Sequence, residues 1–527
     1  MVSERSYDAV IVGAGHNGLA CAAHLASRGW RVAVFEAKGE AGGAVKTREL
    51  TLPGFRHDVA AMNLSMFAGS PFLRVHGEGL IRHGLAFVPA EHCFASVFPD
   101  RSWFGVSRDL ETTTARLRPI NERDATAWQN MLARFGEEAP HIFGLLASAM
   151  PSLTAARVAW KAWRQLGTER TFDLLRLLLS SPRSWLDRNF EDPRVKATLA
   201  AWGMHLDFAP DIAGGALFPY LESMANQAFG MVIGKGGADT MINALTSYLK
   251  GLGGEVHLNS PVAEILASAG STDGVRLADG TVIGAGRAVI ANIAPQILFG
   301  KLLPAGSGNP AADDKLKSLR PGPGTMMVHL ALKAPLHWRA GAELSRFAYV
   351  HVAPDLDYMA RAYAQAIDGL LPTAPVLVVG QPTAIDPSRA PAGKHIAWIQ
   401  VRVLPAQVRG DGEGTIKGCD WTKIKEAYAD RVIGLIENHA PGTSKSIIGR
   451  AVFAPTDLEA ENACLIGGDN LTGSHHLDQN FLFRPTAGYS RYRTPLDRLF
   501  MCGAATWPGA GTGAGSGYLL GKLLAGS

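Results

Sequence analysis

Residues 8–18 of this chain read Asp-Ala-Val-Ile-Val-Gly-Ala-Gly-His-Asn-Gly, and this stretch decides the fold. A short apolar run is followed at once by glycines in the spacing Gly-x-Gly-x-x-Gly, and residues 19–28 then have the alanine-rich composition of a helix. A second apolar run, residues 31–35, ends on Glu36. The order strand, glycine turn, helix, strand and acid predicts a βαβ unit that binds a dinucleotide.

Each residue of this pattern has its own physical role. Gly13 allows the tight turn, Gly15 lets the backbone approach a pyrophosphate, and Gly18 lets the helix pack closely on the strand. The helix N-terminus presents free N–H groups and a partial positive charge to phosphate. Glu36 lies 18 residues after Gly18, near the spacing of about 20 expected for an acid that binds a ribose hydroxyl. A glycine-rich turn without a nucleotide is the alternative, and the complete order of elements argues against it.

Length and composition narrow the class of protein. A chain of 527 residues with 47% apolar residues can form two or more domains with large cores. The net charge is only +4 and the basic residues form no long runs, so nucleic acid is not an expected partner. The five cysteines are widely spaced and form no Cys-x-x-Cys pair, so we expect no zinc site, no dithiol centre and no other metal. A reducing, cytoplasmic environment fits this usage of cysteine.

One basic segment leaves two readings open. Residues 1–7 are polar and carry both signs of charge, unlike a signal peptide, and no apolar stretch reaches 18 residues. Residues 157–179, however, combine arginine, lysine, leucine and the pair Trp160 and Trp163 with helical spacing. Such a helix lies in a membrane interface, or it packs its apolar face on the domain and leaves its charges solvated. A peripheral membrane contact is therefore one of the two expectations for this segment.

The order of patterns along the chain predicts a divided nucleotide domain. Nucleotide-type signals in the first 65 residues give way to long helical patterns over residues 125–222. They return in the glycine-rich residues 234–237, the helix 238–250, the strand 255–258, the Asp-Gly hairpin 274–282 and the strand 287–292. Strands with proline-rich turns fill residues 302–462, and the chain closes with a strand (498–502), a glycine-rich loop (503–517) and a helix (518–525).

These shifts set our expected boundaries. The nucleotide domain takes residues 1–65, 226–300 and 471–527, and the substrate domain takes residues 66–225 and 301–470. The fold class is α/β, with a Rossmann-like domain split along the chain and an inserted α+β domain of mixed or antiparallel sheet plus a helical lobe.

Four passages carry a resemblance to a known family. They are the N-terminal unit with Gly42-Gly43, the run DPSRAPAGKH at 386–395, LDQ at 477–479 with Arg484-Pro485, and YRTP at 492–495 with LFMCG at 499–503 and PGAG at 508–511. Together they resemble FAD-dependent oxidoreductases of the amine oxidase and phytoene desaturase superfamily. The likeness is strongest to the carotenoid desaturase-like branch and its relatives, the pyridine nucleotide-disulfide oxidoreductase domain proteins.

The resemblance implies FAD as the cofactor. It places the adenosine half at the first glycines and Glu36, the pyrophosphate beside Gly42 and Gly43, and the isoalloxazine at the loop 509–517, with the last helix directed to the N1/C2 carbonyl region. The cofactor-binding residues it implies are Gly13, Gly15, Gly18, Glu36, Ala37, Gly42, Gly43, Val262, Asn292, Gly503, Ala504, Gly511 and Gly513. One departure concerns Trp507, where the branch commonly has histidine. Tryptophan cannot carry a proton, so we expect an aromatic ring that shapes an apolar pocket.

No sequence signal identifies a catalytic acid or base. His475 and His476 read as a strand, where neighbouring side chains point to opposite faces and chelate a metal poorly. A polar role at a substrate site and structural hydrogen bonding are the other readings, and for His57 and Asp58 we expect a structural role. Three tyrosines form an aromatic wall or ordinary packing: Tyr489, Tyr492 and Tyr518.

Three functions remain open on the sequence. The first is an FAD-dependent dehydrogenase or desaturase, with isomerase as a variant, that transfers hydride from a hydrophobic, isoprenoid-type substrate to the flavin. The second is an amine oxidase that releases hydrogen peroxide, and the third is a flavoprotein subunit with a binding role. No second complete βαβ pattern exists for a nicotinamide, so oxygen, a quinone or a redox protein is the expected electron acceptor. Self-association is left open.

Overall fold

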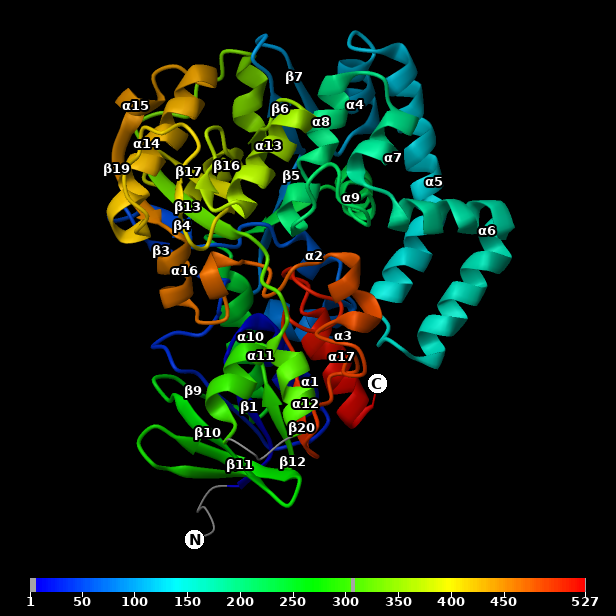
Figure 1. Cartoon of the computed structure of the whole chain (residues 1–527), viewed down its shortest axis with the longest axis vertical. Helices are drawn as coiled ribbons and strands as arrows, with labels where there is room; N and C mark the ends of the chain where they lie inside the picture. Colours follow the sequence, from blue (N-terminus) through cyan, green and yellow to red (C-terminus); the bar gives the residue numbers. More distant parts are fainter. Residues whose placement is uncertain (1–5, 305–308, 527) are drawn as a thin grey trace.

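The computed structural model describes residues 6–304 and 309–526 and contains two large sheets (Figure 1). The first has the strand order β10-β11-β12-β1-β2-β9. Strand β20 also pairs with β12, on the side of β12 opposite to β1. Strands β1, β2, β9, β12 and β20 pair in parallel, whereas β10, β11 and β12 form an antiparallel meander. Their bounds are β1 Ser6–Val12, β2 Val32–Phe35, β9 Glu255–His257, β10 Val262–Ser268, β11 Ser271–Leu277, β12 Val282–Ala291 and β20 Leu499–Met501.

Helices cover this sheet because its central strands are apolar on both sides. All four residues of β2 are buried, as a strand inside a parallel sheet must be. On one face lie α1 (His16–Ser27), α10 (Asp239–Gly251) and α17 (Gly515–Ala525), with α3 (Pro71–Arg82) against α10. The expected split α/β nucleotide domain is thus confirmed, since its strands come from the beginning, the middle and the end of the chain. The predicted strand 287–292 is not separate: it is the second half of β12, whose first half forms the predicted hairpin.

The second sheet has the order β19-β13-β17-β16-β14-β6-β7. Its neighbours are antiparallel except for β14 and β6, so it is a mixed sheet. One face packs against α14 (Trp421–His439), and the other packs against α8 (Pro193–Ala200), α9 (Leu217–Phe229) and α13 (Leu356–Ile367). The strands are β6 His92–Val97, β7 Trp103–Ser107, β13 Gly324–Leu332, β14 Tyr349–Val352, β16 Val376–Gly380, β17 His395–Leu404 and β19 Ile447–Phe453.

The helical lobe carries a projecting arm (Figure 1). Helix α5 (Glu122–Leu146) leads to α6 (Leu153–Leu179), which Gly167 breaks into two helices by its φ of 81° and ψ of 172°. The arm ends at α7 (Pro182–Asn189). No helix within residues 6–304 and 309–526 is long and apolar enough to cross a membrane.

Short elements complete the fold. Small two-stranded sheets are β3 (Thr47–Glu49) with β4 (Arg56–Asp58), β5 (Phe87–Ala90) with β8 (Met231–Gly234), and β15 (Leu370–Leu371) with β18 (Gly410–Asp411). The remaining α-helices are α2 Ser65–Ala68, α4 Leu110–Leu117, α11 Pro295–Ile297, α12 Pro310–Lys317, α15 Thr443–Ser446 and α16 Pro455–Glu461. A π-turn, η2, spans Leu298–Leu302, and the 3₁₀ turns are η1 Gly203–Leu206, η3 Ala342–Arg346, η4 Pro382–Ala384, η5 Pro387–Arg389, η6 Ile466–Gly468, η7 Leu477–Gln479 and η8 Phe481–Phe483.

The two ends of the chain meet where α1 packs on α17. A Cβ at Gly517 would lie 1.8 Å from the carbonyl oxygen of Asn17, so only glycine permits this approach. The Gly517 N–H donates to Asn17 Oδ1 at 3.2 Å and joins the first turns of both helices. Gly521, one turn later, lies against the side chain of His24, where an added Cβ would be 3.0 Å from Cδ2.

Gly517→Ala is expected to destabilise the protein, because the added methyl group must push the two helices apart. Overpacking of this kind costs about 1–3 kcal/mol. The free energy of unfolding from urea denaturation measures the effect. Gly434→Ala is the control, because Gly434 lies exposed inside α14 with no atom within 4 Å of an added Cβ and should gain up to about 1 kcal/mol. Equal effects of the two substitutions would contradict the tight contact.

Candidate active site

The glycines after β1 bring three backbone segments together. Gly13 has a φ of +94°, and a Cβ on it would lie 3.0 Å from the carbonyl oxygen of Asn292. A Cβ on Gly18 would lie 2.5 Å from the Gly13 carbonyl oxygen, so the third glycine does allow close packing of helix on strand. Helix α1 has no side-chain cap and no acid in its first turn. Its first N–H groups therefore remain available for an anion.

Glu36 ties this loop to the end of β2. One carboxylate oxygen accepts the Ala14 N–H at 2.8 Å, and the other accepts the Lys38 N–H at 3.0 Å. An ionised carboxylate has about four acceptor positions, so two remain for ribose hydroxyls. Ala37 follows directly and is exposed. The Ser260 N–H donates to the Glu36 carbonyl oxygen at 2.8 Å, which places Val262, the first residue of β10, two residues from this point.

Gly42 and Gly43 lie against the glycine loop that follows β1 and present only backbone atoms to it. The Gly42 N–H donates to the Ala14 carbonyl oxygen at 2.9 Å, and a Cβ on Gly43 would lie 3.4 Å from the Cα of Gly15. Both have positive φ, 130° and 61°. A backbone cradle without side chains, beside a free helix N-terminus, is the arrangement that a pyrophosphate requires.

Asn292, which follows β12, joins the two ends of the chain. Its Nδ2 donates to the Gly13 carbonyl oxygen at 3.1 Å, and a Cβ on Gly503 would lie 3.0 Å from its Oδ1. The Gly503 N–H donates to Ser516 Oγ at 3.0 Å, and the Ala504 carbonyl oxygen accepts a hydrogen bond from Arg484. Helix α17 also begins without a side-chain cap or an acid in its first turn. Residues 503–517 and the N-terminal glycine loop therefore form one continuous surface.

The loop that contains Gly511 and Gly513 is supported by two histidines. His16 Nε2 lies 3.1 Å from the Gly511 carbonyl oxygen, and His475 Nε2 accepts the Ala510 N–H at 3.0 Å. Burial lowers the pKa of His16 to about 4, and burial together with Arg484 holds the pKa of His475 well below its usual value. Both rings are therefore neutral near pH 7, and His475 acts as an acceptor that positions the loop.

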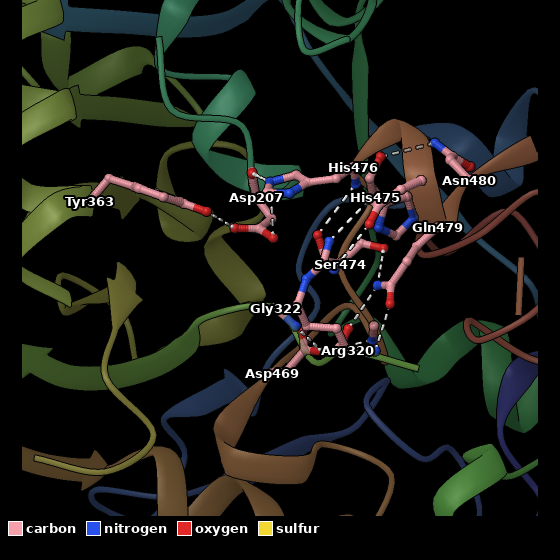
Figure 2. Close-up of polar contacts among 12 residues, drawn as sticks. Asp207, Arg320, Gly322, Tyr363, Asp469, Ser474, His475, His476, Gln479 and Asn480 are labelled. Carbon is pink, nitrogen blue, oxygen red and sulfur yellow. Dashed lines mark hydrogen bonds and ion pairs between the residues drawn. The ribbon is translucent and has the colours of Figure 1, made fainter. Parts of the chain in front are cut away.

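The strand expected at His475 and His476 is wrong, because these residues lie in a loop before η7 (Figure 2). Figure 2 shows His476 directed at Asp207, with Nε2 at 2.7 Å from the carbonyl oxygen and 3.4 Å from Oδ2. Tyr363 of α13 donates to Asp207 Oδ1 at 2.9 Å, and burial raises the pKa of Asp207. His476 thus joins the helical lobe, α13 and the C-terminal segment. The described residues contain no group of three or more metal-ligating side chains.

Asp58 has the structural role expected of it. It forms an ion pair of 2.8 Å with Arg389, and both side chains are fully buried. The carboxylate also accepts from Thr47 Oγ1 at 2.6 Å and from the Ala238 N–H at 2.8 Å. His57 packs its ring 5.4 Å from that of His329. This cluster fixes β4 to the start of α10 and to η5.

Trp507 is buried in the core rather than placed among polar groups. Its Nε1 donates to the Ser148 carbonyl oxygen at 2.8 Å, and its ring lies 5.2 Å from that of Phe481. Tyr492 donates to the Trp507 carbonyl oxygen at 3.0 Å. Tyr518 packs on His24, and Tyr489 lies in another cluster, so the three tyrosines do not form one wall.

An aromatic face of the second sheet, which sequence reasoning missed, packs beside the 511–513 loop. Thr512 Oγ1 donates at 3.1 Å to the carbonyl oxygen of Asn63, the residue that follows Met62. A Cβ on Gly380 would touch both Met62 Sδ and Trp398, at 3.0 and 2.9 Å. The ring of Trp398 stacks on that of Tyr349 at 5.7 Å. Since alternate residues of a strand share a face, only the strand pairing could have assembled these residues.

Comparison with known proteins agrees with this geometry. Residues 18–406 match the family model described as flavin containing amine oxidoreductase. Pyridine nucleotide-disulfide oxidoreductase domain-containing protein 2 of Rattus norvegicus is 27% identical over 97% of this chain and 92% of its own. A limonene dehydrogenase subunit from Castellaniella defragrans is 25% identical over 100% and 95%, and phytoene desaturase (neurosporene-forming) of Cereibacter sphaeroides is 24% identical over 98% and 94%.

A solved structure shows the same fold. An oxidoreductase from Methanosarcina mazei matches with a TM-score of 0.62 and 18% identity, over 97% of this chain and 98% of that one.

Glu36→Ala is expected to weaken cofactor retention, because a charged acceptor is removed from both the ribose position and the Ala14 N–H. Loss of hydrogen bonds to a charged group is worth about 1.5–3 kcal/mol, or roughly 10- to 100-fold in Kd. Titration of the deflavinated variant with FAD, followed by quenching of flavin fluorescence, gives the Kd. Glu49→Ala, at an exposed position on β3, is the control. A Kd for Glu36→Ala equal to that of the control would refute this role.

Proposed function

This chain belongs to the flavin-containing amine oxidoreductase family and is an FAD oxidoreductase, and from this premise we propose that it is a dehydrogenase or desaturase of a hydrophobic, isoprenoid-type substrate. The observation that carries the proposal is the aromatic face of Met62, Tyr349 and Trp398, which lies buried in the core of the second sheet and is linked to the 511–513 loop through Asn63 and Thr512. Such a face binds an apolar chain by burial and excludes water from it.

The residues present fit FAD. Gly15, Gly43 and the free N-terminus of α1 would hold the pyrophosphate, and Glu36 would hold the ribose. The N-terminus of α17 would face the flavin ring, where its partial positive charge favours the negative charge of the reduced form. Bound FAD supplies the site that accepts a hydride. The protein's own residues orient the substrate carbon and keep the surroundings dry.

The names of two relatives support the apolar substrate. Limonene and phytoene, which appear in those names, are hydrocarbons, and each relative covers nearly the whole of this chain. The family description favours a second candidate, oxidation of an amine. The limonene dehydrogenase relative is named as one subunit of its enzyme, which favours a third candidate, a flavoprotein that works only with a partner chain.

Anaerobic mixing of the FAD-loaded protein with terpenes, carotenoids and simple amines separates these candidates. We expect isoprenoids to bleach the flavin absorbance near 450 nm (about where oxidised flavins absorb), because hydride transfer reduces the ring. Bleaching by amines alone, with hydrogen peroxide in air, would reject the dehydrogenase. A flavin that no substrate bleaches until a partner protein is added would identify the third candidate.

The α6 arm exposes a surface that combines large apolar side chains with basic residues. Its exposed apolar side chains include Trp160, Trp163 and Phe172, with exposed fractions of 56%, 49% and 62%. Basic residues lie among them, and the guanidinium of Arg164 lies 5.1 Å from the centre of the Trp160 ring. Tryptophan at the headgroup level with arginine and lysine beside it is typical of helices that bind an anionic membrane surface. We propose that this arm contacts such a surface.

Co-sedimentation with vesicles of phosphatidylcholine and phosphatidylglycerol tests the arm. The bound fraction should fall in the double variant Trp160→Ala/Trp163→Ala and at high salt, because burial and charge both contribute. Ile367→Ala, an exposed apolar residue at the end of α13, is the matched control. Absence of binding by the unmodified protein would overturn the proposal. The proposal would also be overturned if light scattering showed that the unmodified protein is a dimer and that the double substitution makes it a monomer, because the arm would then be a dimer interface.

A further inference from the structure

Arg402 is a buried cation without a carboxylate partner. It lies on β17 with 8% of its surface exposed, and none of the ion pairs among the described residues involves it. Its only hydrogen bonds are long ones from Nη1, at 3.4 Å to the His205 carbonyl oxygen and 3.3 Å to Asn470 Oδ1. Nε is buried and has no hydrogen-bond partner among the described residues, whereas Nη2 is not among their buried unpaired atoms. A buried charge in this condition is costly unless something else completes its bonding.

Two other buried arginines show how this protein otherwise satisfies such a group. Arg389 pairs with the carboxylate of Asp58 at 2.8 Å. Arg484 donates from all three nitrogens to backbone carbonyl oxygens, among them Ala504 at 2.7 Å and Ser474 at 2.9 Å. Both are fully buried; Arg484 is fully bonded, whereas Arg389 relies on its ion pair and on one hydrogen bond from Nε to the Arg56 carbonyl oxygen. Arg402 has neither a carboxylate partner nor a full set of backbone acceptors among the described residues.

The groups around Arg402 offer no counter-charge. His205 and His351 lie with their Nε2 atoms 3.3 Å apart, and burial lowers the pKa of His351 to about 3 and that of His205 well below its usual value. Burial lowers the pKa of Arg402 only to about 9, so the guanidinium is charged near neutral pH whereas the two histidines are not. His351 Nδ1 and the Nε1 of Trp202, whose rings lie 5.4 Å apart, also have no partner among the described residues. Glu222, which acts electrostatically on Tyr349, forms no ion pair with Arg402.

Strand geometry connects this charge to the aromatic face. Across the sheet, Trp398 pairs with Gly380 and Arg402 pairs with Val376. Every second residue of a strand points to the same face, so the side chains of Trp398 and Arg402 share one face. The two residues are four positions apart, or about 13 Å at roughly 3.3 Å per residue. Val403, the next residue, has a φ of 61°, and the register with β13 shifts here. A β-branched residue in the left-handed region is strained, and such bulges redirect side chains near functional sites.

We propose that Arg402 binds a carboxylate at one end of an otherwise apolar substrate. The substrate class would then be an isoprenoid or similar chain that ends in an acid, rather than a pure hydrocarbon. One guanidinium balances the single charge of a carboxylate and matches its planar geometry, whereas a diphosphate would bring more charge than this site can neutralise. The inference rests on the proposed function, because it assumes that the aromatic face holds the apolar part.

Geranic acid and geraniol are matched probes, since they share one chain and differ in the charged end. Calorimetric titration of the FAD-loaded protein should give a Kd for geranic acid at least tenfold below that for geraniol. Arg402→Met should raise the Kd for the acid by about 10- to 100-fold and leave that for the alcohol within about threefold. Arg402→Lys should lie between, because it keeps the charge and loses the fork.

Stability separates a binding role from a structural one. Arg402→Met should melt no lower than the unmodified protein, because it removes an unpaired buried charge. Arg484→Met, the control, should melt lower because several buried carbonyl oxygens lose their donor. Equal loss of melting temperature in both variants, or equal affinity of the unmodified protein for acid and alcohol, would overturn the proposal. Binding of the acid that depends on Arg402, without any flavin bleaching, would instead reject the dehydrogenase and retain the carboxylate site.

Discussion

The contact between Asn17 and Gly517 is the constraint on which this structure depends. The first turns of α1 and α17 can approach only because residue 517 has no side chain, and the Gly517 N–H then donates to Asn17 Oδ1. Two helix N-termini thereby come together at one edge of a parallel sheet. Asn292 fills the space between their loops and bonds to the Gly13 carbonyl oxygen. Residues 500 positions apart in the sequence thus meet in the cradle that we propose for the cofactor.

The second constraint is a sheet that is buried on both faces. One face forms an ordinary apolar core with α14, whereas the other faces the helical lobe. That second face carries apolar rings such as Trp398 and also Arg402 and His351, whose Nε and Nδ1 atoms have no partner among the described residues. Stability alone would not favour polar groups there, because a hydrophobic residue of similar size costs less. Recognition of a substrate with one apolar part and one charged end gives these groups a reason.

The sequence predicts the fold of the nucleotide domain well because short local patterns determine it. The turn at Gly13, the close approach at Gly18 and the acid at Glu36 each act within a few residues of the strand they follow. The role of His475 could not be read in this way, because its partner Ala510 lies 35 residues further along the chain. The strand expected at His475 and His476 is wrong for the same reason, because these residues lie in a loop that is held by contacts with distant segments.

The substrate half is poorly predicted for a related reason. In β17 nearly every residue is buried, so the alternation that marks a half-exposed strand is missing and Arg402 reads as an ordinary polar position. Trp398, Tyr349 and Met62 come from three distant segments, and only the pairing of strands places them together. The split of the nucleotide domain, in contrast, follows from patterns that recur along the chain.

Hydrogen exchange of the protein with and without FAD tests the central claim most directly, which is that one flavin dinucleotide is held by both ends of the chain. The account predicts slower exchange of the backbone N–H groups at residues 13–19, 42–45 and 503–517 together when FAD binds, because these segments form one cradle. Slower exchange at the N-terminal segments alone, with residues 503–517 unchanged, would contradict it.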